Sequence, residues 1–144
     1  MASGEYAMQG RRRTMEDKAV VLQHPHFNID CGLTDNLPRS FFAVYDGHAG
    51  YVAAEYCRRR VHVNLACQKN FFVDSTSALR DALLATENDF CSACIRRHLR
   101  TSSGTCAIVV YIEGSHVTIA NIGGIYVSFV YVSYSNLKYI VFSI

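Results

Sequence analysis

The stretch FFAVYDGHAG, residues 41–50, runs from an apolar segment directly into an acid, two glycines and a histidine. Residues 41–45 are rich in β-forming side chains and short enough to be a buried strand. Asp46 follows, where rigid backbone would hold its carboxylate outside the core. Gly47 and Gly50 allow a sharp turn or a close approach to a ligand. A common surface turn of the Asp-Gly type would have the same sequence. The choice between a functional site and a surface turn therefore depends on the neighbouring segments.

The composition describes an ordinary globular domain. The chain has 144 residues, half of them hydrophobic, and a net charge of +2, which suffices for one domain with a real core. This charge gives no electrostatic argument for a nucleic-acid partner, and the arginine triplet at residues 11–13 is too short to be one. The first ten residues lack a long apolar run, so we expect no signal peptide and a cytoplasmic or nuclear protein.

Six cysteines raise the possibility of disulfides or of a metal site. Without a secretion signal, reduced thiols are the better expectation. Cys91 and Cys94 form a CxxC pair followed by His98, but they fall on a predicted helix, and a zinc site needs a fourth ligand at a suitable spacing. We therefore expect these cysteines to pack as small apolar side chains. For His24 and His26, which flank a proline, we expect a loop.

The order of the predicted elements favours an α+β domain over a doubly wound parallel sheet. Hydrophobic periodicity predicts strands at residues 19–22, 41–45, 105–112 and 116–122, with the last two forming a hairpin. It predicts helices at residues 51–65 and 75–99, and an irregular segment at residues 23–39. The second helix would be capped by Asp74, Ser75 or Ser77, and its arginine-rich end suits the negative pole of the helix dipole.

Residues 125–144 differ in style from the rest, because they combine Tyr, Val, Ser, Ile and Phe with a single charge, Lys138. Further β-strand, a membrane segment and sequence not selected to fold all remain open. Scattered serines, Asn136 and Lys138 make a membrane-spanning helix a poor fit, and we expect no membrane partner.

Three acids have a spacing that suggests a metal site. Glu16 and Asp17 precede the first predicted strand, and Asp46 follows the second. If these strands pair, the three carboxylates meet at one sheet edge, although a solvated Glu-Asp turn is the common alternative. Carboxylates, together with the backbone carbonyl of Gly47, are the oxygen ligands that Mg²⁺ and Mn²⁺ prefer. Two such ions can activate water for attack on phosphorus.

Arg12 and His48 add groups suited to phosphate chemistry. A guanidinium grips phosphate oxygens in a bidentate fork, which a lysine cannot match. A histidine titrates near neutral pH, so His48 could protonate a leaving oxygen. Without these neighbours, His48 would be interpreted as a turn or core histidine.

The motifs RRRTMED, FFAVYDGHAG, SSGTCAIVV and VTIANIG, in this order, resemble the metal-dependent protein serine/threonine phosphatases of the PP2C (PPM) type. The resemblance runs from about residue 6 to residue 123. It implies a monomeric enzyme with an antiparallel β-sandwich flanked by helices. It also implies two Mg²⁺ or Mn²⁺ ions, a phosphorylated protein as substrate, and attack by water without a phosphoenzyme.

The resemblance also implies roles for individual residues. Asp46 would bridge the metals, Gly47 would offer its carbonyl, and Glu16 would bind a metal directly or through water. Asp17 would support these ligands. Arg12 would bind the substrate phosphate, and His48 would be the general acid.

The chain departs from the family pattern after residue 123. The family continues ANIG with Asp-Ser-Arg, whereas this chain has Gly124-Ile125-Tyr126, and no acid occurs in residues 124–144. We therefore expect residues 1–123 to be the N-terminal part of a phosphatase domain, truncated and incomplete, and residues 124–144 to be a divergent hydrophobic tail. With these carboxylates missing, a catalytically inactive, phosphatase-like interaction module is the alternative to an active enzyme.

Overall fold

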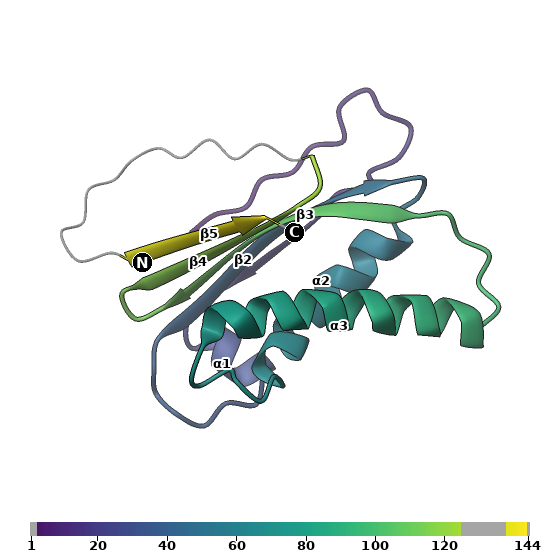
Figure 1. The fold of residues 1–144 in the computed structure, drawn as a ribbon. Helices are drawn as coiled ribbons and strands as arrows, with labels where there is room; N and C mark the ends of the chain where they lie inside the picture. The colour runs from purple at the N-terminus through teal and green to yellow at the C-terminus, as the bar shows by residue number, and fades with distance from the viewer. Residues whose placement is uncertain (1–2, 125–137, 144) are drawn as a thin grey trace.

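The computed structural model describes residues 3–124 and 138–143 and shows one sheet with helices on one of its faces (Figure 1). The sheet has the order β1-β2-β3-β4-β5. Its neighbours are antiparallel except for β4 and β5, which run parallel. The elements, in chain order, are β1 (Lys18–Leu22), α1 (His26–Asp30), β2 (Arg39–His48), α2 (Val52–Ala66), α3 (Ser75–Arg96), β3 (Gly104–Glu113), β4 (His116–Ile122) and β5 (Lys138–Ser143).

The predicted fold class is confirmed, since antiparallel strands combine with flanking helices. The described residues supply a single sheet of the expected sandwich. The hairpin is confirmed as β3 and β4. In the tail, residues 138–143 form a strand, while residues 125–137 and 144 lie outside the described part.

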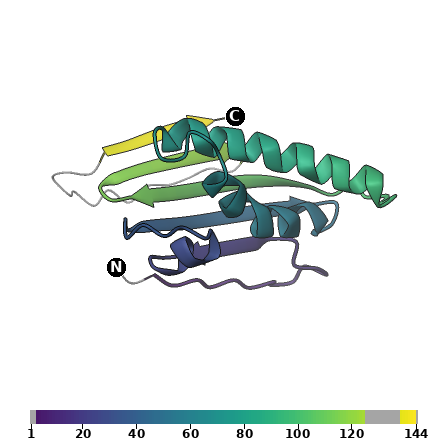
Figure 2. The ribbon, with the colours of Figure 1, turned by 90° about the horizontal axis from the view of Figure 1, so that it is seen from below.

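Burial alternates along β2 with the two-residue period of a strand. Phe41, Ala43 and Tyr45 are buried on the face that α2 and α3 cover, as Figure 2 shows from below. Val44 and Asp46, which alternate with them, are exposed. The core therefore lies between the helices and one face of the sheet, and Asp46 lies on the opposite face from this core.

The segment predicted to be irregular, residues 23–39, was partly wrong, because it contains the short helix α1 and the first residue of β2. His26 begins this helix, and only His24 lies in the loop. The physical reason is Phe27, which is fully buried and packs on the rings of Phe41 and Tyr111. This tertiary contact stabilises a helix too short to be stable on its own.

The ends of α3 explain its length. The Asp74 side chain accepts hydrogen bonds from the backbone N–H groups of Thr76 and Ser77, both at 3.1 Å, so Asp74 is the N-cap. The helix ends at Arg96, three residues before the predicted end, because His98 adopts a left-handed conformation with φ of 51°.

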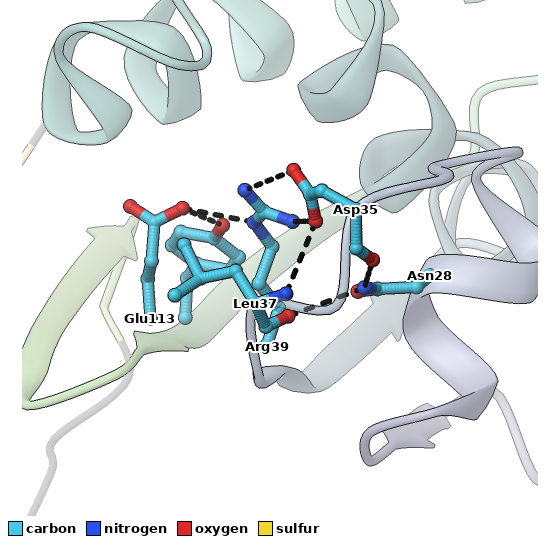
Figure 3. A network of polar contacts seen from close by, with 6 residues as sticks. Asn28, Asp35, Leu37, Arg39 and Glu113 are labelled. Carbon is cyan, nitrogen blue, oxygen red and sulfur yellow. Dashed lines mark hydrogen bonds and ion pairs between the residues drawn. The ribbon is translucent and has the colours of Figure 1, made fainter.

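The sheet end farthest from Asp46 is held by a buried arginine (Figure 3). Arg39 is 2% exposed, pairs with Asp35 through a hydrogen bond from Nη1, and donates from Nε to Glu113 at 2.8 Å. Its guanidinium carbon lies 5.2 Å from the ring centre of Phe71. A buried cation is tolerated only when it is paired in this way, so Arg39 joins the loop before β2 to the end of β3.

Candidate active site at the end of strand β2

The register of β1 and β2 brings the predicted acids to one edge. Lys18 pairs with Tyr45, and partners in an antiparallel pair advance in opposite directions along the chain. Two further steps place Asp17 opposite Asp46 and Glu16 opposite Gly47. A Cβ atom added to Gly47 would lie 2.5 Å from the backbone oxygen of Glu16, so the two segments touch here.

Glu16 is directed at the turn that follows β2. Its Oε2 accepts a hydrogen bond from the backbone N–H of Gly50 at 3.1 Å, and its Oε1 accepts one from the Thr14 hydroxyl at 3.1 Å. The residue is half-buried. The carboxylate is therefore held beside the DGHAG segment from 34 residues away in the chain.

Asp46 is exposed, and its carboxylate forms no hydrogen bond or ion pair with any residue in 3–124. Its backbone carbonyl accepts a hydrogen bond from the Thr105 hydroxyl at 3.0 Å. Cys106 is its partner on β3, and a Cβ atom on Gly123 would lie 2.6 Å from the sulfur of Cys106. The backbone around Asp46 is thus fixed while its side chain stays available to a ligand.

His48 is exposed, and its ring lies against Gly104 at the start of β3. A Cβ atom on Gly104 would lie 2.4 Å from Nε2 of His48, so glycine is required there for the ring to occupy its place. His48 also lines a cavity of about 390 Å³ that reaches back to Tyr45. Burial raises the pKa of Tyr45 well above its ordinary value, so its hydroxyl stays protonated behind the site.

The turn between β2 and α2 is held by a residue that sequence reasoning did not assign to the site. The Ser103 hydroxyl accepts a hydrogen bond from the backbone N–H of Ala53 at 2.7 Å. Tyr51, at the N-cap position, makes no such bond, so Ser103 satisfies the first turn of α2 from the segment just before β3. The motif SSGTC could have indicated this contact, because it places Ser103 next to Gly104, on which His48 packs.

Arg12 precedes the strand that follows Glu16 and Asp17, and it lies outside the described sheet. It lies in an exposed turn in which Gln9 Nε2 donates to its backbone carbonyl at 2.8 Å. Within the described chain, no hydrogen bond or ion pair links its guanidinium to Glu16 or Asp46. Asp17 is exposed and lines a groove toward Lys18 and Val21.

The oxygen donors of the candidate site are of the type that a hard divalent cation prefers, but too few of them are grouped together. Oxygen donors from Asp46, Gly47 and Glu16 are what Mg²⁺ and Mn²⁺ select. Among residues 3–124, however, no three His, Cys, Asp or Glu side chains are grouped closely enough to hold an ion. The six cysteines are free thiols, and no helix in the described part is long and apolar enough to cross a membrane.

Known proteins share sequence and fold with this chain. The sequence model of the family Protein phosphatase 2C matches residues 1–125. Over 118 residues, or 82% of this chain, the sequence is 39% identical to Protein phosphatase 1F of Homo sapiens and 38% identical to Protein phosphatase 1E of Mus musculus. The aligned parts are 25% and 15% of those proteins, so the chain spans a quarter of their length or less.

A solved structure has a similar fold. It is described as "Structure of a C.elegans sex determining protein" and superposes with a TM-score of 0.57 at 19% identity, over 73% of this chain and 25% of that one. This likeness concerns the fold alone, whereas the sequence matches cover the motifs at Glu16, Asp46 and Ser103. On these grounds, the chain belongs to the protein phosphatase 2C family.

Proposed function

We propose that this chain carries the N-terminal half of the active site of a metal-dependent protein phosphatase that hydrolyses phosphoserine and phosphothreonine. The observation that supports the proposal most is the bond from the Gly50 N–H to the Glu16 carboxylate. It holds two distant motifs together beside Asp46, whose carboxylate has no partner in the described chain.

Asp46, the carbonyl of Gly47 and Glu16 would hold Mg²⁺ or Mn²⁺, with Asp17 supporting them from the neighbouring strand. The bound cations would supply a water whose pKa is lowered enough to attack phosphorus at neutral pH. Because the described chain groups so few carboxylates, we expect the 144-residue chain to bind these ions weakly and to turn over slowly.

The other residues would act on the substrate directly. The Arg12 guanidinium is exposed and free of ion pairs in the described chain, so it can grip phosphate oxygens in a bidentate fork. His48 would give a proton to the serine or threonine oxygen as it leaves, since histidine is the side chain that most often transfers protons in catalysis. The close contact with Gly104 would keep its ring in place.

The test is phosphate release from a phosphothreonyl peptide in the presence of Mn²⁺. We expect slow release that a chelator stops and that Asp46→Asn reduces at least tenfold. Asp30→Asn is the control, since Asp30 is exposed on α1 and also loses one negative charge. Release that persists in the Asp46 variant would reject the assigned role of this residue.

A catalytically inactive interaction module is the second candidate, and the short supply of grouped carboxylates favours it. In this case the chain would bind the phosphothreonyl peptide through Arg12 without releasing phosphate. Binding that is lost in Arg12→Lys, with no phosphate release in Mn²⁺, would identify this outcome. Neither binding nor release would reject both candidates.

A further inference from the structure

The C-terminal end of α3 carries a surface that the proposed catalytic roles do not use. Ile95 is 75% exposed and Leu99 is 48% exposed. Arg96, Arg97 and Arg100 are exposed around them. We call these five residues the α3-end patch. The two apolar side chains and the three cations share one exposed surface.

The α3-end patch is held in one conformation by the way the helix ends. The Leu99 N–H donates to the carbonyl of Cys94 at 3.0 Å, and the His98 N–H donates to the carbonyl of Ile95 at 3.2 Å. With His98 in the left-handed conformation, this is a Schellman motif, which fixes Leu99 against the last turn. A preformed surface of this kind loses little conformational entropy when it binds a partner.

The positive charge of the patch is not neutralised locally. No Asp or Glu occurs between Asp89 and Glu113 in the sequence. Within the described chain, none of the three arginines forms an ion pair. The patch therefore presents three cations to a partner, and an acidic partner is the one that complements them.

The patch borders the candidate active site. Arg100 precedes Gly104 by four residues, and the His48 ring packs on Gly104. Four residues of extended chain span at most about 14 Å, so Arg100 lies within this distance of the backbone beneath His48. Figure 1 shows the end of α3 and the loop to β3 at the same end of the molecule as the turn between β2 and α2.

A hollow beside Arg100 is open to an apolar side chain. It has a volume of about 530 Å³ and is lined by Cys94, Ile95, His98, Leu99 and Arg100. A nucleic acid gains affinity when many cations of the protein neutralise its phosphates. This patch has three arginines, with apolar side chains beside them, which does not favour a nucleic acid. The combination suits a peptide that carries acids next to a leucine or isoleucine.

From these observations we infer that the α3-end patch binds an acidic segment with an apolar residue in the phosphoprotein substrate, close in sequence to the phosphorylated residue. This inference rests on the proposed function, since it names the substrates that the same site would select. The acids would face the arginines, and the apolar residue would enter the hollow.

The test is binding measured by fluorescence anisotropy, with the 144-residue chain and no added metal. The probe is a labelled, unphosphorylated peptide, Asp-Asp-Leu-Glu-Ile, and the comparison peptide replaces its acids by the amides, Asn-Asn-Leu-Gln-Ile. We expect the acidic peptide to bind at least tenfold more tightly at low salt, and the difference to shrink as salt rises. Equal affinities of the two peptides would overturn the inference.

Two double variants with the same change in charge separate the patch from the overall charge. Arg97→Glu with Arg100→Glu should lower the affinity for the acidic peptide at least tenfold. Lys69→Glu with Arg80→Glu, in the loop before α3 and near its start, should change it less than twofold. Circular dichroism checks that both fold. Equal losses in both variants, or tighter binding of single-stranded DNA than of the peptide, would also overturn the inference.

The failure of this inference can be told apart from failure of the proposed function. The peptide carries no phosphate and the assay contains no metal, so Asp46→Asn should leave peptide binding unchanged while it reduces phosphate release. Peptide binding without phosphate release in the wild type would count against the phosphatase activity alone. Phosphate release without peptide binding would count against the patch alone.

Discussion

The close contact between Gly47 and the backbone of Glu16 makes Gly47→Ala the most informative single change. The added Cβ would lie 2.5 Å from the Glu16 oxygen and 3.1 Å from its carbonyl carbon. These are backbone atoms, so no side-chain rotation relieves the contact. The segment before β1 must move away from β2 by roughly 0.7–1 Å to restore an ordinary carbon–oxygen separation.

The size of the effect follows from three terms. Overpacking of this kind costs about 1–3 kcal/mol. Moving the segment also weakens the bond from the Gly50 N–H to Glu16, which is worth about 1 kcal/mol. Against these costs, Ala restricts the unfolded chain and contributes about 0.4–1 kcal/mol to stability, because Gly47 does not adopt a left-handed conformation. We therefore expect a net loss of roughly 1–2 kcal/mol in the free energy of unfolding.

Urea denaturation measures this loss, and the NMR shift of the Gly50 amide reports whether its bond to Glu16 survives. Gly4→Ala is the matched control, because nothing lies within 4 Å of a Cβ at Gly4. Affinity for Mn²⁺ should also fall at least threefold in the Gly47 variant and stay unchanged in the control. An unchanged free energy of unfolding together with an unchanged Gly50 shift would refute the inferred contact.

Three further changes test the core and its titration by urea denaturation. Tyr45→Phe should stabilise the fold by about 1 kcal/mol, because its buried hydroxyl has no hydrogen-bond partner in the described chain; a loss of stability would reveal a partner. Arg39→Met should lower the stability, since it removes the hydrogen bonds from the guanidinium to Asp35 and Glu113; an unchanged stability would contradict this structural role. Burial lowers the pKa of His62 in the folded chain below its ordinary 6.5, so the unfolded chain binds a proton more readily than the folded one. The free energy of unfolding should therefore be highest above pH 6.5 and should decline below it, and His62→Gln should remove this decline. An equal decline in the His62 variant would assign the titration to another group.

Local patterns in the sequence predicted most of the elements. The alternation in residues 41–45 matches the burial observed in β2, and Asp74 caps α3 as predicted. These features depend on residues a few positions apart, where periodicity and capping chemistry act. The prediction missed α1, because its stability comes from the contact of Phe27 with rings on β2 and β3, and no local pattern records such a contact.

The sequence proposed the members of the candidate site but not their arrangement. The motifs named Glu16, Asp46 and His48, and the resemblance assigned them roles. Glu16 faces the Gly50 N–H rather than solvent because of the register of β1 and β2. A slip of one residue in this register would turn each side chain to the other face of the sheet. Arg12 lies in a turn outside these strands, and no pairing in the described chain joins it to the acids.

The amino-acid sequence by itself determined the strands β1 to β4, the two long helices and the presence of oxygen donors at a strand end, because each depends on neighbours along the chain. Only the tertiary structure decided which distant groups meet. The Ser103 hydroxyl accepts a hydrogen bond from the N–H of Ala53, 50 positions away in the sequence. Arg39 can be buried because Glu113, 74 positions away, accepts a hydrogen bond from its Nε. Strand register decides which of these distant groups meet, and the cost of burying an unpaired polar group decides which of them must be paired. Both are properties of the folded chain.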